Sequence, residues 1–284
     1  MQMPQHSSKR NRKDVNKRLD EGCGQGRGLD YKPAIWIMDF PSQGFSVQGL
    51  GWKTQREYHL FSMSEFHYFY ALEWSPIVID IREQFPLELE ETLDIAKQCG
   101  YKHPVNPDTG EPNVMTTDFV VTIPGTTGIG IMDQARTVKL SRELQNPRVL
   151  EKFEIERRYW ESRKISWGIV TEQDIPEVLA KNIGFLHNYF FIQNLSPLSE
   201  LNIRQITAVL AEGVIQGDVS LSGLAAQCDE RLALEPGSSL AVARHLIANR
   251  KWLIDMNQPL QAQFRNKLTL LATPSLKYET NKSC

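Results

Sequence analysis

Two stretches of alternating polar and apolar residues, joined by a short turn sequence, constrain the fold of this chain more than any other feature. The first is TTDFVVTI (116–123), in which Asp118 and Phe119 fall on opposite faces, and the second is IGIMDQARTVK (129–139). The sequence PGTTG (124–128) lies between them. Alternation with a period of two is typical of a strand, and a glycine-containing turn between two such runs predicts a β-hairpin.

The segments around this hairpin alternate between strand and helix patterns. The expected elements are short strands and turns over 35–60, a helix over 62–74, a strand over 76–87, a polar helix or loop up to His103, a helix over 148–163 and a strand over 165–172. In the helix over 62–74, the aromatic and leucine side chains predict one buried stripe (Phe66, Phe69, Tyr70, Leu72). This order predicts an α/β unit with a mixed sheet flanked by helices.

The strand over 76–87 is expected to place Ile77, Ile79 and Ile81 together on one face. The helix over 148–163 is expected to place Leu150, Phe153, Arg157 and Trp160 at helical spacing along one side.

The texture of the sequence changes between Thr171 and Pro176, and the remainder is mainly helical. Three helices are expected over 201–214, 220–234 and 238–250, followed by a short strand and a wing over 251–260. Three helices and a β-ribbon of this size resemble a winged-helix module, a relative of the helix-turn-helix. A plain helical bundle is the alternative.

The chain has 284 residues, enough for two domains of ordinary size. We therefore divide it into a basic N-terminal segment (1–22), a first domain (23–172) and a C-terminal winged-helix-like domain (173–284). The basic segment is expected either to be a solvated tail or to form an arm that neutralises phosphates. The glycine-rich stretch EGCGQGRGLD that follows predicts a flexible loop, since it lacks the spacing of a phosphate-binding fingerprint.

Composition narrows the class of protein. The net charge of −2 gives no global argument for nucleic-acid binding. No apolar run is long enough to span a bilayer, so we expect no membrane partner. The four cysteines are scattered without a CxxC pair, which favours a reducing cytoplasm and a metal held by oxygen ligands, with no small-molecule cofactor.

Asp118 and Lys139 fall on the two strands of the predicted hairpin. Metal-dependent phosphodiester nucleases of the restriction-endonuclease type place an Asp on one strand and a (D/E)xK pair on the next. In this chain Thr137 stands two residues before Lys139, where that pattern has a carboxylate. The pattern by itself is weak, because a solvated Asp and a surface Lys would give the same spacing.

The missing carboxylate has to come from another element, and the helix over 62–74 offers two. Glu65 ends the sequence SMSE, which is a capping box, so its side chain would also serve to satisfy the first helical amide groups. Glu73, two turns later, is the rival candidate.

Longer motifs are more specific than this spacing. The sequences SMSEFHYFYALEW, DIREQFPL, MTTDFVV, ARTVK and LEKFEIERRYW together resemble the TnsA family, the endonuclease subunits of Tn-seven-type transposases. The resemblance runs from about Gly24 to about Trp167 and implies a restriction-endonuclease-like nuclease fold for this part of the chain. The C-terminal part matches mainly in its helical, winged-helix-like character.

The resemblance also implies a set of site residues. Glu65, Asp118 and Lys139 correspond to the catalytic residues, and Glu65, Asp118 and the main-chain carbonyl of Thr137 to the ligands of Mg²⁺, with Mn²⁺ as a substitute. A further acidic position of the family falls on Glu156. Its alternative interpretation is an exposed helix charge paired with Lys152.

The activity implied by the resemblance is DNA cleavage at the 5′ ends of a transposon during cut-and-paste transposition, in a bacterial cytoplasm at the nucleoid. The implied partners are double-stranded DNA at the transposon ends, a TnsB-type transposase and a TnsC-type AAA+ regulator. Two alternatives remain open. One is a stand-alone restriction or repair nuclease, and the other is a winged-helix DNA-binding regulator with an inactive nuclease-like domain.

Overall fold

In a computed structural model, the protein is described at residues 15–36, 47–107, 109–125, 129–217, 219–266 and 268–272. The chain divides into two compact units, Met1–Ile175 and Pro176–Cys284, whereas the predicted division was at 172/173. Over the described ranges, none of the helices has both the length and the apolar character that a membrane crossing requires.

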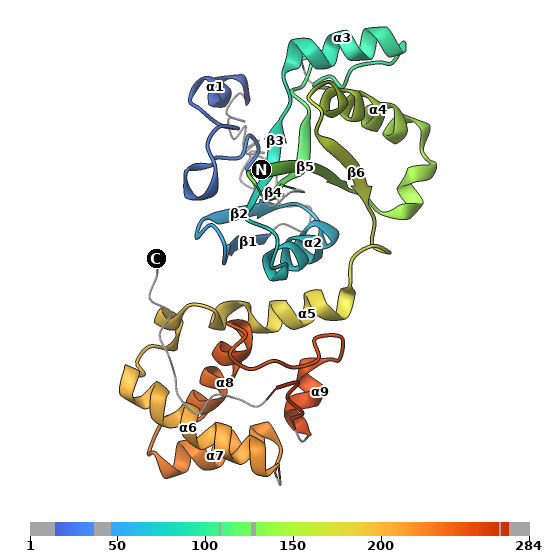
Figure 1. The fold of residues 1–284 in the computed structure, drawn as a ribbon. Helices are drawn as coiled ribbons and strands as arrows, with labels where there is room; N and C mark the ends of the chain where they lie inside the picture. Colours follow the sequence, from blue (N-terminus) through green and yellow to red (C-terminus); the bar gives the residue numbers. More distant parts are fainter. Residues whose placement is uncertain are drawn as a thin grey trace, which may run out of the picture. The chain divides into compact units, whose positions relative to one another are not determined.

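A four-stranded mixed sheet forms the centre of the first unit (Figure 1). Its strands are β3 (Asp80–Pro86), β4 (Thr116–Pro124), β5 (Ile131–Val138) and β6 (Ser166–Val170), adjacent in that order. The pairs β3–β4 and β4–β5 are antiparallel, while β5 and β6 are parallel. The predicted hairpin over 116–139 and the predicted mixed sheet are thus confirmed, although residues 126–128 of the turn lie outside the described part.

Two helices cover one face of the sheet: α3 (Leu89–Cys99) and α4 (Pro147–Ser162). Helix α4 starts at an Asn146 cap with proline at its first position, which is the favoured arrangement for a helix start. Its buried side is formed by Ile155, Glu156, Tyr159 and Trp160, and Leu150 is 46% exposed. The buried side of the helix is therefore rotated relative to the predicted stripe. The prediction followed apolar spacing alone, which does not predict a buried glutamate.

The other face of the sheet is covered by α2 (Met63–Trp74) and by the ribbon of β1 (Val47–Leu50) and β2 (Glu57–Leu60). The ring of Tyr68 on α2 meets Phe119 of β4 edge-on, with 5.5 Å between the centroids. Phe69, Tyr70 and Leu72 are buried as predicted, whereas Phe66 is only partly buried.

Because the sheet is covered on both faces, β3 does not alternate between a core side and a solvent side. Ile77 and Ile79, which precede the strand, are 58% and 49% exposed, and only Ile81 is fully buried. The prediction of one shared isoleucine face was wrong. Both sides of β3 instead bury charged or polar residues (Asp80, Arg82, Glu83, Gln84).

The N-terminal part packs against this unit, although residues 1–14 lie outside the described ranges. Arg18, in the short helix α1 (Val15–Asp20), is buried, donates to the carbonyl of Ala34 at 3.1 Å and lies over the ring of Trp36. It is therefore not available as part of a phosphate-binding arm.

The glycine-rich loop is also more ordered than predicted. Gly24 has a φ of 81°, and a Cβ atom there would lie 2.3 Å from the ring of Pro86. Three residues later, Arg27 holds both carboxylate oxygens of Asp133 on β5, at 3.0 and 2.7 Å. The loop thus connects the N-terminal segment to the sheet.

A buried ion pair joins the ribbon to β3. Arg56 donates to both carboxylate oxygens of Glu83, at 2.9 and 2.5 Å, and the two side chains are 6% and 0% exposed. The guanidinium group also lies over the rings of Tyr31 and Tyr58, with its carbon 5.0 and 3.9 Å from their centroids. Aromatic faces and a bidentate carboxylate together replace the water that the charge has lost.

The second unit is helical at its described residues. It contains α5 (Glu177–Leu186), α6 (Glu200–Gln216), α7 (Leu221–Arg231), α8 (Ser238–Ala248) and α9 (Leu260–Arg265), with short 3₁₀ helices at His187–Tyr189 and Ile192–Leu195. The three helices expected over 201–214, 220–234 and 238–250 correspond to α6, α7 and α8. Helix α6 has a capping box at Ser199 and α7 a serine cap at Ser220, which explains why their starts were readable.

The strand and wing expected over 251–260 are wrong, since residues 251–259 form turns and coil and Leu260 begins α9. Three of their backbone groups bond to one side chain. The amide nitrogen of Asn182 donates to the carbonyls of Met256 and Gln258, at 2.9 and 2.8 Å, and its oxygen accepts from the amide of Leu260. Without a β-ribbon among the described residues of the second unit, the winged-helix assignment is not confirmed.

The Arg56–Glu83 pair generates a stability prediction. Glu83→Ala leaves a buried guanidinium group without its carboxylate, so the free energy of unfolding should fall by about 3–5 kcal/mol. Glu200→Ala is the control, because it breaks an exposed pair with Arg204 on α6 and should cost less than about 1 kcal/mol. Urea titrations of the two variants measure both values, and equal losses would contradict the role assigned to the buried pair.

Candidate active site

The candidate site lies where the β4–β5 ladder ends. The last backbone pair of the ladder on this side is Phe119 with Arg136. Lys139 turns its amide toward β6, where it donates to the carbonyl of Val170 at 2.9 Å, so the preceding amide of Val138 points toward β4. That amide donates to the side chain of Asp118, at 2.7 Å, instead of to a backbone carbonyl. Asp118 thus occupies the gap that opens as the two strands separate.

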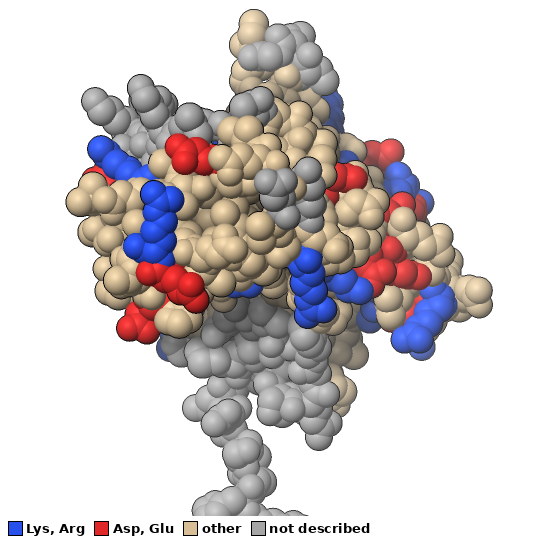
Figure 2. All heavy atoms as spheres, turned by 90° about the horizontal axis from the view of Figure 1, so that it is seen from below, with Lys and Arg blue, Asp and Glu red and all other residues tan. Residues whose placement is uncertain are grey.

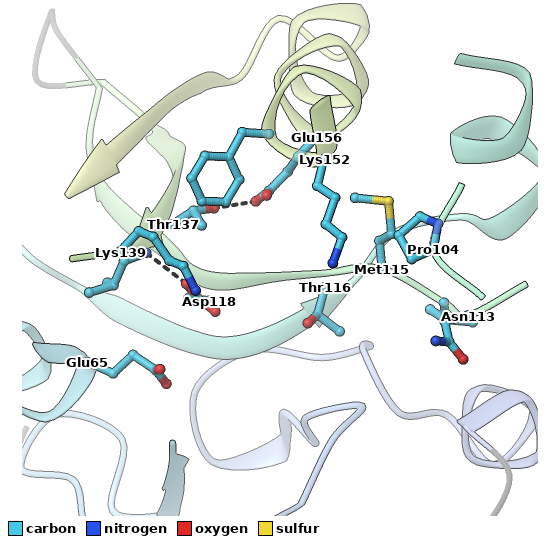
Figure 3. Close-up of a pocket in the computed structure, with 13 residues that line it drawn as sticks. Glu65, Pro104, Asn113, Met115, Thr116, Asp118, Thr137, Lys139, Lys152 and Glu156 are labelled. Carbon is cyan, nitrogen blue, oxygen red and sulfur yellow. Dashed lines mark hydrogen bonds between the residues drawn. The ribbon is translucent and has the colours of Figure 1, made fainter. Parts of the chain in front are cut away.

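A pocket of about 350 Å³ surrounds this point, and it brings most of the predicted site residues together. Figure 3 shows Asp118, Thr137 and Lys139 at the strand ends, Glu65 approaching from α2 and Glu156 from α4. Elements from both faces of the sheet therefore contribute to one cavity. A pocket of this kind, with several carboxylates and a lysine around it, suits a small cation and a phosphate.

Burial raises the pKa of Asp118 above its usual range. The amide of Val138, the side-chain amide of Gln84 and the positive charge of Lys139 oppose this rise. The raised pKa means that the carboxylate ionises at some cost in a pocket without a cation, and that a bound cation would lower this cost.

Glu65 combines the two roles considered for it from the sequence. Its backbone amide donates to the hydroxyl of Ser62, which caps α2. Its carboxylate accepts from the amide of Phe61 and from the Ser62 hydroxyl, at 3.0 and 2.9 Å, and it also lines the pocket. Burial raises the pKa of Glu65, and the negative charge of Asp118 raises it further. The ionised form of one carboxyl group therefore disfavours ionisation of the other.

Lys139 lines the pocket but makes its ion pair elsewhere. Its ammonium group lies 2.8 Å from Glu143, in the 3₁₀ helix Ser141–Gln145. The two side chains are 35% and 39% exposed. Exposed pairs of this kind contribute little to stability, so the lysine can exchange Glu143 for another anion at small cost.

Glu156 is buried, and the interpretation of it as an exposed helix charge paired with Lys152 is wrong. It is 3% exposed and accepts hydrogen bonds from the hydroxyls of Thr117 and Thr137, at 2.6 and 2.5 Å. The indole N–H of Trp160, one turn later on α4, donates to Thr117 at 2.7 Å. Burial raises the pKa of Glu156 to about 7, against the effect of the two hydroxyls.

This network also changes the account of Thr137. The family resemblance implies a role only for its main-chain carbonyl, but its hydroxyl donates to Glu156 and links β5 to α4. Glu156 and Trp160 are four residues apart and so lie on one face of the helix. This spacing was a signal in the sequence that could have indicated the network.

Glu73 does not line the pocket. It accepts hydrogen bonds from the backbone amides of Trp52 and Lys53, and so it holds the turn between β1 and β2. Burial raises its pKa to about 7. Three residues that line or adjoin the pocket are not predicted as parts of the site from the sequence: Gln84, Thr117 and Lys152.

The donor set fits a hard divalent cation. Glu65 and Asp118 face one pocket, and each of their four oxygens accepts one hydrogen bond, which leaves a lone pair on each for a metal. Mg²⁺ is usually bound by one or two carboxylates together with carbonyl groups, water and substrate phosphates. Across the described ranges, no group of three His, Cys, Asp or Glu side chains is arranged to hold a metal ion. Two carboxylates are thus the set available here.

Comparisons with known proteins show which family the chain resembles. The family model described as TnsA-like endonuclease N terminal matches residues 75–172, and the one described as TnsA endonuclease C terminal matches 174–256. The chain is also similar to the transposon Tn7 transposition protein TnsA of Escherichia coli, with 38% identity over 243 residues that cover 83% of each protein. Asp118, Thr137 and Lys139 lie inside the first match, whereas Glu65 precedes it.

The buried carboxyl of Glu156 predicts a pH-dependent stability. Its pKa is raised from 4.5 to about 7, so folding holds a proton that the unfolded chain releases, and wild-type stability falls as pH rises through this window. Glu156→Gln keeps an oxygen acceptor for both threonines and removes this loss. In EDTA, the free energy of unfolding of the variant minus that of the wild type should increase between pH 5 and 7.5, by on the order of 2 kcal/mol.

Glu154→Gln on the same helix is the control for this measurement. Hydrogen bonds from Arg157 and Arg158 lower the pKa of Glu154 to about 2, so it stays ionised throughout that window. Its difference from wild type should be constant between pH 5 and 7.5. A constant difference for Glu156→Gln as well would contradict the buried, protonated state.

Proposed function

The chain belongs to the TnsA endonuclease family, and on this premise we propose that it is a Mg²⁺-dependent endonuclease that cleaves DNA at the 5′ ends of a transposon during cut-and-paste transposition. The observation that supports this most is the pocket at the end of the β4–β5 ladder, which collects Glu65, Asp118 and Lys139.

The proposed roles follow from the chemistry of each group. Glu65 and Asp118 would hold the metal ion, for which Mn²⁺ can substitute, whereas the Thr137 carbonyl lies trans to the Val138 amide and so points toward β6, away from Asp118. When bound, Mg²⁺ supplies Lewis acidity toward the scissile phosphate. Lys139 leaves Glu143, orients the attacking water and stabilises the negative charge that develops on the phosphate.

Glu156 has a supporting role in this proposal. It lines the pocket, is held there by Thr117 and Thr137, and fixes the end of β5 against α4. The position of this end of β5 therefore depends on a carboxyl group that need not touch the metal or the DNA.

Partner proteins supply DNA affinity and choice of site. The net charge of −2 is unusual for a protein that would hold DNA alone. On the face drawn in Figure 2, basic and acidic side chains are interspersed, and uncharged surface occupies most of the described area. We propose that a TnsB-type transposase, which processes the other strand, and a TnsC-type AAA+ regulator recruit this subunit. The reaction would take place in the bacterial cytoplasm, at the nucleoid.

Lys139→Ala tests the catalytic assignment. In a transposition reaction reconstituted with the partner proteins and resolved by strand, 5′-strand cleavage should fall by about a hundredfold or more, because the charge-stabilising group is lost. Joining of the 3′ ends should persist, so the products should change from simple insertions to cointegrates.

Lys97→Ala on α3 is the control, since this exposed lysine is outside the pocket. Unchanged 5′ cleavage by Lys139→Ala would overturn the proposed site. Cleavage by wild-type protein alone, without partners, would support a stand-alone nuclease instead.

Asp118→Asn tests the metal assignment without DNA. Ligands that bind only the folded state stabilise it, by about 2.7 kcal/mol at a hundredfold excess over the dissociation constant. Saturating Mg²⁺ should therefore raise the melting temperature of the wild type by about 5 °C and leave that of Asp118→Asn unchanged. Asp94→Asn, an exposed position on α3, should respond like the wild type. An equal rise in all three proteins would exclude Asp118 as a ligand.

A further inference from the structure

Gln84 lies directly opposite Asp118 in the β3–β4 register. The ladder pairs Glu83 with Phe119 and Phe85 with Thr117, and the position between these pairs, Gln84 with Asp118, is the one that the ladder skips. Directly opposed residues in an antiparallel sheet have their Cβ atoms about 5 Å apart, so side chains at such positions contact each other.

The side chain of Gln84 contacts β4 through both ends of its amide. Its nitrogen donates to the first carboxylate oxygen of Asp118 at 3.4 Å. Its oxygen accepts from the hydroxyl of Thr116 at 3.1 Å, which fixes which way the amide is turned. Since Gln84 is only 5% exposed, these contacts are made away from bulk water.

The two oxygens of Asp118 are consequently held from two different strands. Gln84 of β3 donates to one oxygen, and the backbone amide of Val138 on β5 donates to the other. One lone pair on each oxygen remains free for a cation in the pocket. The rotation of the carboxylate about its own axis is thereby restricted before any ligand arrives.

The backbone at Gln84 is unusual for this residue type. Its φ is 47°, in the left-handed region that glycine and asparagine adopt most readily, and its carbonyl accepts from the amide of Ala34 at 3.3 Å. Asparagine or glycine would relieve the strain, but neither side chain is long enough to contact Asp118 and Thr116 together. Glutamine is therefore present at a strained position where only a side chain of its length contacts both residues of β4.

We propose that Gln84 is a positioning residue for Asp118, which orients the carboxylate toward the metal ion. This inference rests on the proposed function, because it requires Asp118 to be a metal ligand. Groups that hydrogen-bond to a metal-binding carboxylate typically change metal affinity by 10–100-fold when they are removed. Gln84 itself contacts neither the metal nor the DNA.

The test measures metal affinity directly. Calorimetric titration of the full chain with Mn²⁺, without DNA, should give a dissociation constant about tenfold higher for Gln84→Asn than for wild type. Gln84→Met keeps the side-chain length and the strained backbone but lacks the amide, so it should show the same weakening, which separates the loss of the amide from any change in strain. Gln134→Asn on β5, whose side chain bonds to Arg136, is the matched control and should bind like the wild type.

A second readout separates positioning from general stability. In the reconstituted reaction, Gln84→Asn should need about tenfold more Mg²⁺ for half-maximal 5′ cleavage, and saturating Mg²⁺ should restore the rate. Damage to the fold would not be rescued in this way, and melting temperatures in EDTA measure such damage independently.

The outcomes distinguish this inference from the proposed function. If both Gln84 variants bind Mn²⁺ as wild type does, while Asp118→Asn does not bind it, the positioning role is overturned and the proposed function stands. If Asp118→Asn binds Mn²⁺ and cleaves like the wild type, the proposed function fails as well. A lower melting temperature of the Gln84 variants with an unchanged dissociation constant would also overturn the positioning role.

Discussion

The separation of β4 from β5 beyond Phe119 and Arg136 is the constraint on which the rest of the site depends. Up to that pair, backbone groups of the two strands satisfy each other, and beyond it the amide of Val138 needs another acceptor. The side chain of Asp118 provides it. A carboxylate in an inner strand of a sheet that is covered on both faces is costly to ionise, and this contact, with its counterpart from Gln84, offsets part of the cost. Structure and proposed chemistry therefore use the same hydrogen bonds.

Three carboxyl groups with raised pKa values line one pocket, and burial is the first cause in each case. Buried carboxyl groups of this kind occur at sites that bind cations, because the charge of the bound ion stabilises the ionised carboxylates. The stabilising contacts lie in other parts of the first unit. Arg56 with Glu83, and Arg27 with Asp133, fix the ribbon and the N-terminal loop to the sheet through pairs that keep their charges satisfied. The cost at the pocket is thus separated in space from the contacts that hold the unit together.

The two units show different limits of prediction from sequence. In the second unit, helix starts were readable because serine caps are local signals, but the segment after α8 was not. Its apolar residues have strand-like spacing, yet it forms turns and coil, and Asn182, more than 70 residues away, satisfies part of its backbone. In the first unit, Glu73 and Glu65 lie on one helix, and only the arrangement of β1, β2 and β4 around that helix decides which of them meets Asp118.

The sequence by itself determined the β4–β5 hairpin, the mixed sheet, the helices that carry Glu65 and Glu156 and the motifs that identify the family. These features depend on periodicity, caps and turns, which act between residues close in the chain. Only the tertiary structure decided that Glu156 is buried beneath Thr137, that Lys139 rests on Glu143 and that Gln84 stands opposite Asp118. The physical reason is that the burial and ionisation of a side chain depend on which elements cover it, and that covering is set by contacts between distant parts of the chain.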